Sequence, residues 1–443
     1  MGTTTVVRAG WVLTVDAEDR VLADGAVAFC DGAITGVGPA AEVLAAHPGA
    51  DVVHLPGHAL LPGLVNAHTH FGMTMFRGYA DDRDLQDFLG VVIPAEERVL
   101  DPGRVRVATR AAAVESVLAG VTTALDMYFF HAEGTAGADE VGMRLQTGQI
   151  VVDVPGPEGM GWEQRLESAG QWLAERPARP GWRPVVAPHS TYAVSPEHLA
   201  AVATLAADHG AAVHVHASES AGELDLVASL HGRRPLAVLD DVGLLRPGTV
   251  LAHAVWLDDD EVAQVAATGT AVAHCPASNL KLASGVARVP ELLTAGAVVG
   301  IGTDGPASSN DLDMFLAMRL AALLHKGAGP TATGGPAAGA EALSAAQVLR
   351  MATAGGAAAV GLGDDVGALE VGRRADLLAV DLDQPHTQPV FDPVSTVVYA
   401  AGRGDVRHVW VDGRAVVRDG ETVQVARSQV VADLKDLQRA VEA

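Results

Sequence analysis

Residues 59–70 read Ala-Leu-Leu-Pro-Gly-Leu-Val-Asn-Ala-His-Thr-His, an apolar stretch that ends in two histidines, His68 and His70. Side chains two positions apart on a strand point to the same face, so both imidazoles can reach one metal ion. An isolated His-x-His pair can equally be two hydrogen-bonded histidines. Three later apolar stretches, however, also end in metal-ligating or acid–base residues: Val213-His-Val-His-Ala-Ser-Glu219, Leu251-Ala-His253 and Gly300-Ile-Gly-Thr-Asp304. Four such strand ends in one chain predict an active site.

The middle of the chain, roughly residues 60–365, alternates apolar strands with helical stretches, which is typical of βα units around a parallel sheet. Alanine-rich amphipathic segments such as 104–119 and 196–209 separate the strands, and Ser195 with Pro196 predicts a helix start. Eight βα repeats in about 300 residues favour an α/β fold of the closed (β/α)₈ TIM-barrel type. The expected strands begin near Leu60, Thr122, Met143, Pro184, Ala211, Thr249, Thr270 and Ala297.

In such a barrel the active site lies at the carboxyl ends of the strands. The sequence agrees, because polar residues follow the apolar runs. The expected strand ends carry His68 and His70, Asp126, Arg144, His189, His216 with Glu219, His253, the segment His274 to Asn279, and Thr303 with Asp304.

Both ends of the chain consist of short apolar stretches broken by Asp-Gly turns, which are typical of β-strands. Residues 1–58 and 367–430 are therefore expected to form one small composite β-sandwich domain. Residues 59–366 would form the barrel and 431–443 a C-terminal helix. The Gly-, Ala- and Pro-rich stretch 326–340 predicts a mobile loop.

The 443 residues carry 30 Lys and Arg against 54 Asp and Glu, a net charge of −24, which argues against a nucleic-acid partner. Two cysteines, Cys30 and Cys275, cannot build a disulfide framework and favour a cytoplasmic protein. The chain has no signal-peptide pattern and no run of about 18 apolar residues, so no membrane association is expected.

The metal site predicted from these strand ends has four ligands: His68, His70, His216 and Asp304. Three imidazoles and one carboxylate suit Zn²⁺, with Fe²⁺ or Mn²⁺ as alternatives. A metal-bound water loses a proton near neutral pH and supplies hydroxide. The fourth strand, Val186-Ala-Pro-His-Ser, contains no lysine that could bridge two ions after carbamylation, so one ion per subunit is expected.

Two residues near these ligands are predicted to be catalytic. Glu219 follows His216 by three positions and would carry a proton from water to the substrate, although a surface glutamate is the alternative. His253 would orient the water and stabilise negative charge, or else be a satisfied core histidine. Asp304 could also accept a proton from the attacking water. His214 is expected to face the opposite side of the sheet and to be structural.

The motifs resemble the amidohydrolase superfamily, and within it the ATZ/TRZ group of deaminases and chlorohydrolases, most closely its 5-methylthioadenosine/S-adenosylhomocysteine deaminases. The resemblance covers nearly the whole chain. It rests on Leu61-Pro-Gly-Leu-Val-Asn-Ala-His-Thr-His, Arg77-Gly-Tyr-Ala-Asp-Asp, Ala187-Pro-His-Ser, His274-Cys-Pro-Ala-Ser-Asn and Gly302-Thr-Asp-Gly. It implies the same four metal ligands, Glu219 as the proton-transferring acid, and His253 beside the metal.

The resemblance also implies substrate contacts. Glu96 falls where adenosine-type deaminases hold ribose hydroxyls, and Arg144 and His189 fall at substrate-contacting positions. A structural ion pair is the equal alternative for Glu96 and Arg144. Trp256, in an Ala-Val-Trp segment that replaces a more common Cys-Val-His, and Asn279 are expected to bind substrate as well. Gln149 stands where some relatives carry a second arginine.

These features favour a metal-dependent enzyme, first of all a hydrolytic deaminase of an adenosine-like or other amino-substituted heteroaromatic small molecule. The alternative is a chlorohydrolase, or an enzyme of amide or cyclic C–N bonds that hydrolyses or condenses an aromatic natural product. A non-catalytic scaffold would have lost a ligand or Glu219, and none is missing. The resemblance further implies a homodimer or homotetramer.

Overall fold

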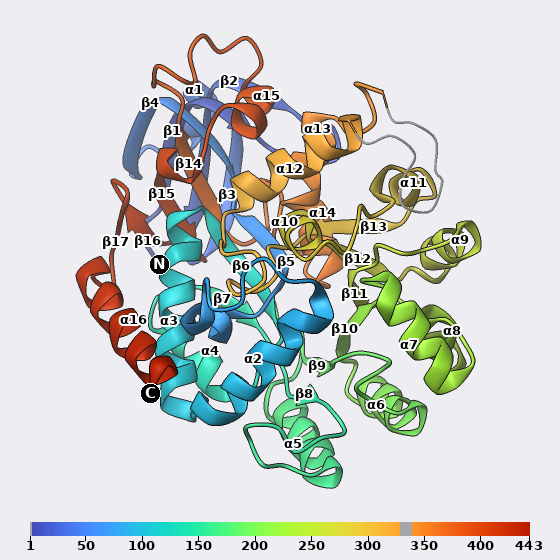
Figure 1. Cartoon of the computed structure of the whole chain (residues 1–443). Coiled ribbons are helices and arrows are strands. Elements are labelled where there is room, and N and C mark those ends of the chain that lie inside the picture. Colours follow the sequence, from blue (N-terminus) through green and yellow to red (C-terminus); the bar gives the residue numbers. More distant parts are fainter. Residues whose placement is uncertain (1, 328–338) are drawn as a thin grey trace.

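Parallel strands in the middle of the chain form a barrel (Figure 1). The computed structural model describes residues 2–327 and 339–443, so most of the loop expected over 326–340 lies outside the described residues. The barrel strands are β5 (Leu64–Thr69), β6 (Val121–Asp126), β7 (Arg144–Gln146), β8 (Ile150–Val151), β9 (Val185–Pro188), β10 (Ala212–Ala217), β11 (Thr249–His253), β12 (Ala271–His274) and β13 (Val298–Ile301).

The predicted count of eight barrel strands is confirmed, with the third strand interrupted. β7 pairs with β6 and β8 pairs with β9, so these two short segments on either side of residues 147–149 occupy one place in the barrel. The first and last strands meet where the backbone N–H of Asp304 donates to the carbonyl of His68 at 3.0 Å. This bond brings the two ends of the ligand set together.

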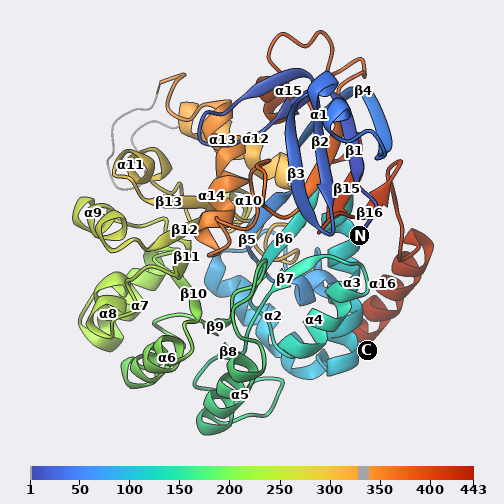
Figure 2. The same cartoon turned by 180° about the vertical axis from the view of Figure 1, so that it is seen from behind.

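Helices surround the barrel, as the views from both sides show (Figures 1 and 2). Ser195 caps α6 by accepting from the His198 N–H, and the expected helices at 104–119 and 196–209 are present. The helices and 3₁₀ turn of this part are η1 (Phe71–Phe76), α2 (Leu85–Val99), α3 (Pro102–Leu118), α4 (His131–Asp139), α5 (Trp162–Glu175), α6 (Pro196–Asp208), α7 (Ala221–His231), α8 (Pro235–Asp241), α9 (Asp259–Thr268), α10 (Pro276–Lys281), α11 (Val289–Thr294), α12 (Met314–Gly327), α13 (Ala345–Met351) and α14 (Ala354–Ala359).

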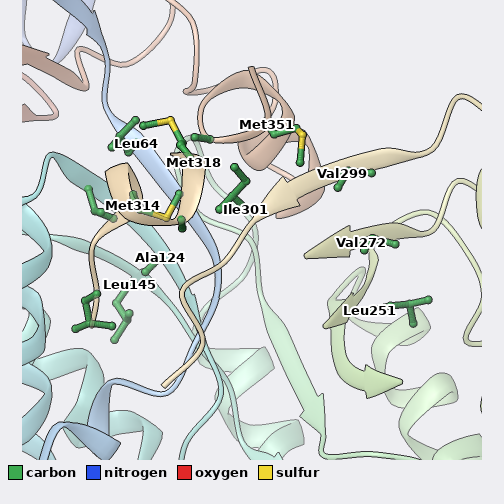
Figure 3. Packing of buried hydrophobic residues seen from close by; sticks show 14 of the residues in the cluster. Leu64, Ala124, Leu145, Leu251, Val272, Val299, Ile301, Met314, Met318 and Met351 are labelled. Atoms are coloured by element: carbon green, nitrogen blue, oxygen red, sulfur yellow. The ribbon is translucent and has the colours of Figure 1, made fainter. Parts of the chain in front are cut away.

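Methionines of two helices close the core over the first and last barrel strands (Figure 3). Met318 of α12 and Met351 of α13 belong to one buried cluster with Leu64 of β5 and Ile301 of β13. An unbranched thioether fills an irregular gap well, so these side chains suit the junction of converging strands. The packing fixes the strands that lead into the site.

Both ends of the chain share one eight-stranded sheet. Phe29 of β2 and Trp410 of β15 have ring centroids 6.4 Å apart although three strands separate β2 from β15 in the sheet, so the sheet curls over itself like a sandwich. Its order is β17 (Glu421–Thr422), β16 (Arg414–Arg418), β15 (Val406–Val411), β14 (Leu377–Asp381), β4 (Asp51–Pro62), β1 (Thr5–Leu13), β2 (Val21–Cys30) and β3 (Ala33–Pro39).

Short helices complete this part: α1 (Ala40–Ala46), α15 (Pro393–Tyr399), η2 (Arg403–Asp405) and the C-terminal α16 (Arg427–Glu442). α16 lies along α3, where Arg110 pairs with Asp433 at 2.7 Å (Figures 1 and 2). The sheet extends to Pro62 and resumes at Leu377, whereas the division into domains at 58/59, 366/367 and 430/431 stays a prediction. None of the helices in the described ranges is long and apolar enough to cross a membrane.

Arg144 does not lie at the carboxyl end of a strand, so that prediction is wrong. It is the first residue of β7, at the opposite end of the barrel from the polar strand ends. There its buried guanidinium pairs with Asp376 and, at 2.5 Å, with Asp412. The ion pair joins the barrel to the terminal sheet, which is the structural alternative that the sequence left open.

Candidate active site

The four predicted metal ligands converge at the carboxyl ends of β5, β10 and β13. The Nε2 atoms of His68 and His70 lie 3.2 Å and 3.3 Å from Asp304 Oδ1, and the Nε2 atoms of His70 and His216 are 3.2 Å apart. All four side chains are buried. Four potential ligand atoms from three separate strands therefore surround a space that a single ion can occupy.

Each imidazole is oriented through its other ring nitrogen. His70 Nδ1 lies 2.5 Å from the Met127 carbonyl, and His216 Nδ1 lies 2.8 Å from the His189 carbonyl. A carbonyl only accepts, so both Nδ1 atoms donate and both Nε2 atoms keep a lone pair for a metal. The backbone thus fixes the tautomer that coordination requires.

His68 is held differently, by His214 at 2.7 Å between His68 Nδ1 and His214 Nε2. The prediction that His214 faces the opposite side of the sheet is wrong, because His214 and His216 are two residues apart on β10 and point to the same side. His214 still acts structurally, because it orients a neighbouring imidazole and does not line the cavity.

Asp304 is held by three donors. The hydroxyls of Ser278 and Ser308 each donate to Oδ2 at 2.6 Å, and the Gly305 N–H donates to Oδ1 at 2.7 Å. Burial opposes ionisation of Asp304, but interactions with His68 and His70 outweigh it and hold the carboxyl pKa well below its usual range. Asp304 is therefore an anion in a buried site, as a metal-binding carboxylate must be.

These residues fit a divalent cation. Nε2 of His68 is buried and has no hydrogen-bond partner among the described residues, which is costly unless another group uses its lone pair. Burial lowers the pKa of His68 to about 3 and that of His216 well below its usual value, so both imidazoles stay neutral. Burial disfavours the charged form of His70, but its contact with Asp304 outweighs burial and raises its pKa to about 9, so this imidazole would release a proton when a metal binds. Three imidazoles beside an anionic carboxylate are then the donor set that zinc, iron and manganese accept.

Glu219 and His253 lie beside this ligand set. His253 Nε2 is 3.7 Å from Glu219 Oε2, and both residues are buried. Burial raises the pKa of the Glu219 carboxyl, which brings it closer to the neutral range where a group can both accept and release a proton. The backbone N–H groups of Ser218 and Glu219 donate to the Glu223 carboxyl, at 3.0 Å and 2.6 Å, and hold the segment in place.

A cavity of about 430 Å³ opens from the ligand set towards α2. Glu96 and His189 line it, as the sequence predicted. Glu96 is buried and accepts a hydrogen bond from the Tyr128 hydroxyl at 2.6 Å. Burial raises the pKa of Glu96 to about 7. No cation of residues 2–327 or 339–443 pairs with this carboxyl, so it remains available for a polar group of a ligand.

Three other predicted substrate contacts do not line the cavity, and these predictions are wrong. Arg144 lies at the far end of the barrel. Asn279 lies behind His253, where its Oδ1 accepts from His253 Nδ1 at 2.8 Å. Trp256 donates from its indole N–H to the Ser284 carbonyl at 2.6 Å and packs against the core. Asn279 nevertheless matters to the site, because it fixes the His253 ring with Nε2 towards Glu219.

Sequence reasoning missed Tyr128, Glu223 and the two serines that hold Asp304. Tyr128 follows the predicted strand end at Asp126 by two residues, so the strand pattern could have predicted its place near the carboxyl edge. Ser278 lies inside the segment from His274 to Asn279 that was singled out, and Ser308 four residues after Asp304. Which of these side chains turns towards the ligands depends on loop conformation, and the strand pattern does not encode it.

Comparison with known proteins agrees with this geometry. A model of the amidohydrolase family matches residues 59–416. A 5-methylthioadenosine/S-adenosylhomocysteine deaminase from Syntrophobacter fumaroxidans is 40% identical over 434 residues, 98% of this chain and 97% of that protein. An adenosine deaminase from Xanthomonas campestris, solved with bound zinc, has a TM-score of 0.95 and 37% identity, and the match covers 99% of both chains.

An atrazine chlorohydrolase from Arthrobacter aurescens TC1, solved with zinc, has a TM-score of 0.89 and 27% identity, with 98% of this chain and 100% of that chain covered. The chain belongs to the amidohydrolase family and is a metal-dependent hydrolase of that family. The resemblance and the barrel architecture predicted from the sequence are thereby confirmed.

Proposed function

We propose that this enzyme hydrolytically removes the amino group from the purine ring of an adenosine-like nucleoside. The observation that carries the proposal is the pairing of two buried carboxyl groups in one cavity. Glu219 lies beside the metal-ligand set, and Glu96 lines the same cavity from α2. A proton-transferring acid for the ring and an acceptor for a ribose diol are the two polar groups that such a substrate needs.

His68, His70, His216 and Asp304 would hold one ion per subunit, and Zn²⁺ is the proposed metal, since the Xanthomonas campestris relative was solved with bound zinc. When bound, the ion lowers the pKa of a coordinated water towards 7 and so supplies a nucleophile at neutral pH.

Glu219 moves the protons of the reaction. It accepts one proton from the attacking water as oxygen adds to the ring carbon that bears the amino group, and it delivers that proton to the adjacent ring nitrogen. The second water proton passes to the amino group, the C–N bond breaks, and ammonia leaves as the ring carbonyl forms. The raised pKa of Glu219 suits this alternation between base and acid.

His253 and Glu96 have positioning and binding roles. His253 presents Nε2 to the same space as Glu219 and stabilises the charge that develops on the attacking oxygen, while Asn279 keeps its ring from turning. Glu96, with the Tyr128 hydroxyl on one oxygen, keeps its second oxygen for the ribose hydroxyls. His189 closes the cavity beside His216.

A second candidate function is hydrolysis of a C–Cl or other C–N bond on a heteroaromatic ring, including reverse condensation. The structural likeness to the atrazine chlorohydrolase favours it, because the same ligand set can activate water against a different leaving group. Glu96 argues against it, since a chlorotriazine has no pair of neighbouring hydroxyls for this buried carboxyl to bind.

Product release from the purified enzyme decides between the two. Ammonia release is measured with adenosine and 5′-methylthioadenosine, and chloride or amine release with chlorotriazines and aryl amides, with the Glu219→Gln variant as control. The proposal predicts ammonia from the nucleosides and turnover of the other compounds at least about 100-fold lower. Chlorotriazine turnover without nucleoside turnover would refute it. A homodimer or homotetramer and a cytoplasmic location belong to the same proposal, and light scattering of the purified enzyme tests the first.

A further inference from the structure

The outer part of the cavity is an apolar sleeve, and its described lining residues include no lysine or arginine. Its walls beyond Glu96 come from α2, from the segment after β8 and from α7. The apolar residues of this sleeve are Leu85, Phe88, Leu89, Val92, Ile93, Val152, Val154 and Leu230. Among the described residues that line the whole cavity there is no lysine or arginine.

Several acidic side chains also line the cavity. Asp153 lies next to Val154 in the sleeve. Its carboxylate accepts a hydrogen bond from the Ser195 N–H at 2.9 Å and contacts the His198 ring nitrogen at 2.7 Å. The full set of acidic residues in the cavity is Glu96, Glu97, Asp153, Glu219 and Asp304. A ligand carboxylate entering the sleeve would lose water without gaining a cation.

Two cations near the cavity, Arg165 and Lys281, are already paired. Arg165 is fully buried and binds Glu158 and the Pro155 carbonyl. Lys281 donates to Asp81 at 2.7 Å and to Asn310 at 2.8 Å. The neutral Gln149 is also engaged, since its amide donates to Glu158 and accepts from Ser168.

The mouth of the sleeve exposes apolar side chains. Ile93, Val154 and Leu230 are 46%, 61% and 54% exposed. Ile93 precedes Glu96 by three residues on α2, so it lies about 4.5 Å further along the helix axis. A nucleoside whose ribose diol binds Glu96 would extend its 5′ substituent over this apolar surface.

We infer that the enzyme acts on purine nucleosides with an uncharged, apolar 5′ substituent, such as an alkylthio group, and discriminates against nucleosides that carry an amino acid there. The inference rests on the proposed function. It separates the two substrates after which the Syntrophobacter fumaroxidans relative is named, because a methylthio group is neutral and a homocysteine tail carries a carboxylate.

The test compares kcat/KM for 5′-methylthioadenosine, a longer 5′-alkylthioadenosine series, adenosine and S-adenosylhomocysteine. We expect kcat/KM for 5′-methylthioadenosine to exceed that for S-adenosylhomocysteine by about 100-fold or more. In the alkylthio series kcat/KM should rise about two- to fourfold per added methylene until the sleeve is filled. Turnover of 5′-methylthioadenosine and S-adenosylhomocysteine within about threefold would overturn the inference and leave the deaminase proposal intact. No turnover of any nucleoside would refute the proposed function itself.

A charge placed in the sleeve tests the physical reason. Val154 is exposed, so Val154→Arg is compatible with the fold, and Val154→Gln is the matched uncharged control. Val154→Arg should raise kcat/KM for S-adenosylhomocysteine, relative to kcat/KM for 5′-methylthioadenosine, about three- to tenfold. Val154→Gln should leave this ratio unchanged. Equal changes in both variants would contradict the argument from charge.

Discussion

Replacing Glu219 by glutamine tests the proton-transfer role most sharply, because an amide of nearly the same shape cannot take up and release the proton. The residue is 4% exposed, and no lysine or arginine in the described part of the chain forms a salt bridge with it. Glutamine has the same shape and keeps a polar end towards His253, so the metal ligands should not move. General acid–base help is worth about 10²–10⁴-fold, and kcat should fall by that amount.

Stability should not fall with activity. Because burial raises the pKa of Glu219, the folded state disfavours its ionised form, and this cost grows as pH rises above the value at which the unfolded chain loses the proton. The neutral amide avoids the cost, so the midpoint of thermal unfolding should be equal or higher at pH 7.

The assay is ammonia release under saturating nucleoside, with metal content and thermal unfolding measured on the same preparation. Glu96→Gln is the matched control, since it alters another buried carboxyl of the same cavity and should raise KM while kcat stays within about threefold. A Glu219→Gln variant with near wild-type kcat would refute the reasoning. So would a variant that loses its metal, because Glu219 would then be a ligand.

Further outcomes follow from other parts of the structure. His68→Ala should reduce bound metal well below one ion per subunit by elemental analysis, and full occupancy would exclude His68 as a ligand. Burial raises the pKa of Glu96 from 4.5 to about 7 in the folded protein. The free energy of unfolding of the wild type, compared with that of Glu96→Gln, should therefore decline between pH 4.5 and 7, by about 3 kcal/mol at most, and be constant above pH 7. Urea unfolding at pH 5 and 8 measures this, and a difference that does not depend on pH would contradict it. Arg144→Met leaves Asp376 buried and unpaired, so stability should fall by about 3–5 kcal/mol with kcat/KM of the folded enzyme within about threefold. A raised KM with unchanged stability would restore Arg144 as a substrate contact.

The ligand set could be predicted because its residues follow buried parallel strands. His68, His216 and Asp304 come directly at or after apolar runs, and in a barrel these ends meet at one face. The same rule failed for Arg144, since the third strand begins at that residue and continues beyond an interruption. A strand of three residues is too short for its sequence pattern to show where it begins and ends.

Residues after the strands were harder to place. Asn279 and Trp256 follow strand ends in sequence, yet both turn away from the cavity and support its wall. Helix α10 carries Asn279 behind His253, and the indole of Trp256 reaches a backbone carbonyl. Such orientations follow from loop conformations, including the left-handed backbone at His253 and Ala254, which periodicity does not reveal.

The error over His214 had a different cause. Its spacing of two residues from His216 means that both side chains share a face of β10, and the structure shows His214 against His68.

The terminal sheet was predictable from repeated strand and turn patterns at both ends of the chain. The pairing of β4 with β14 that joins these ends depends on contacts across more than 300 residues.

Anomalous X-ray scattering at the zinc edge from crystals of the purified enzyme tests the central arrangement most directly. The account predicts one peak per subunit, within coordination distance of Nε2 of His68, His70 and His216 and of an Asp304 carboxylate oxygen. Two peaks in this cavity, or a single peak bound by other side chains, would contradict it.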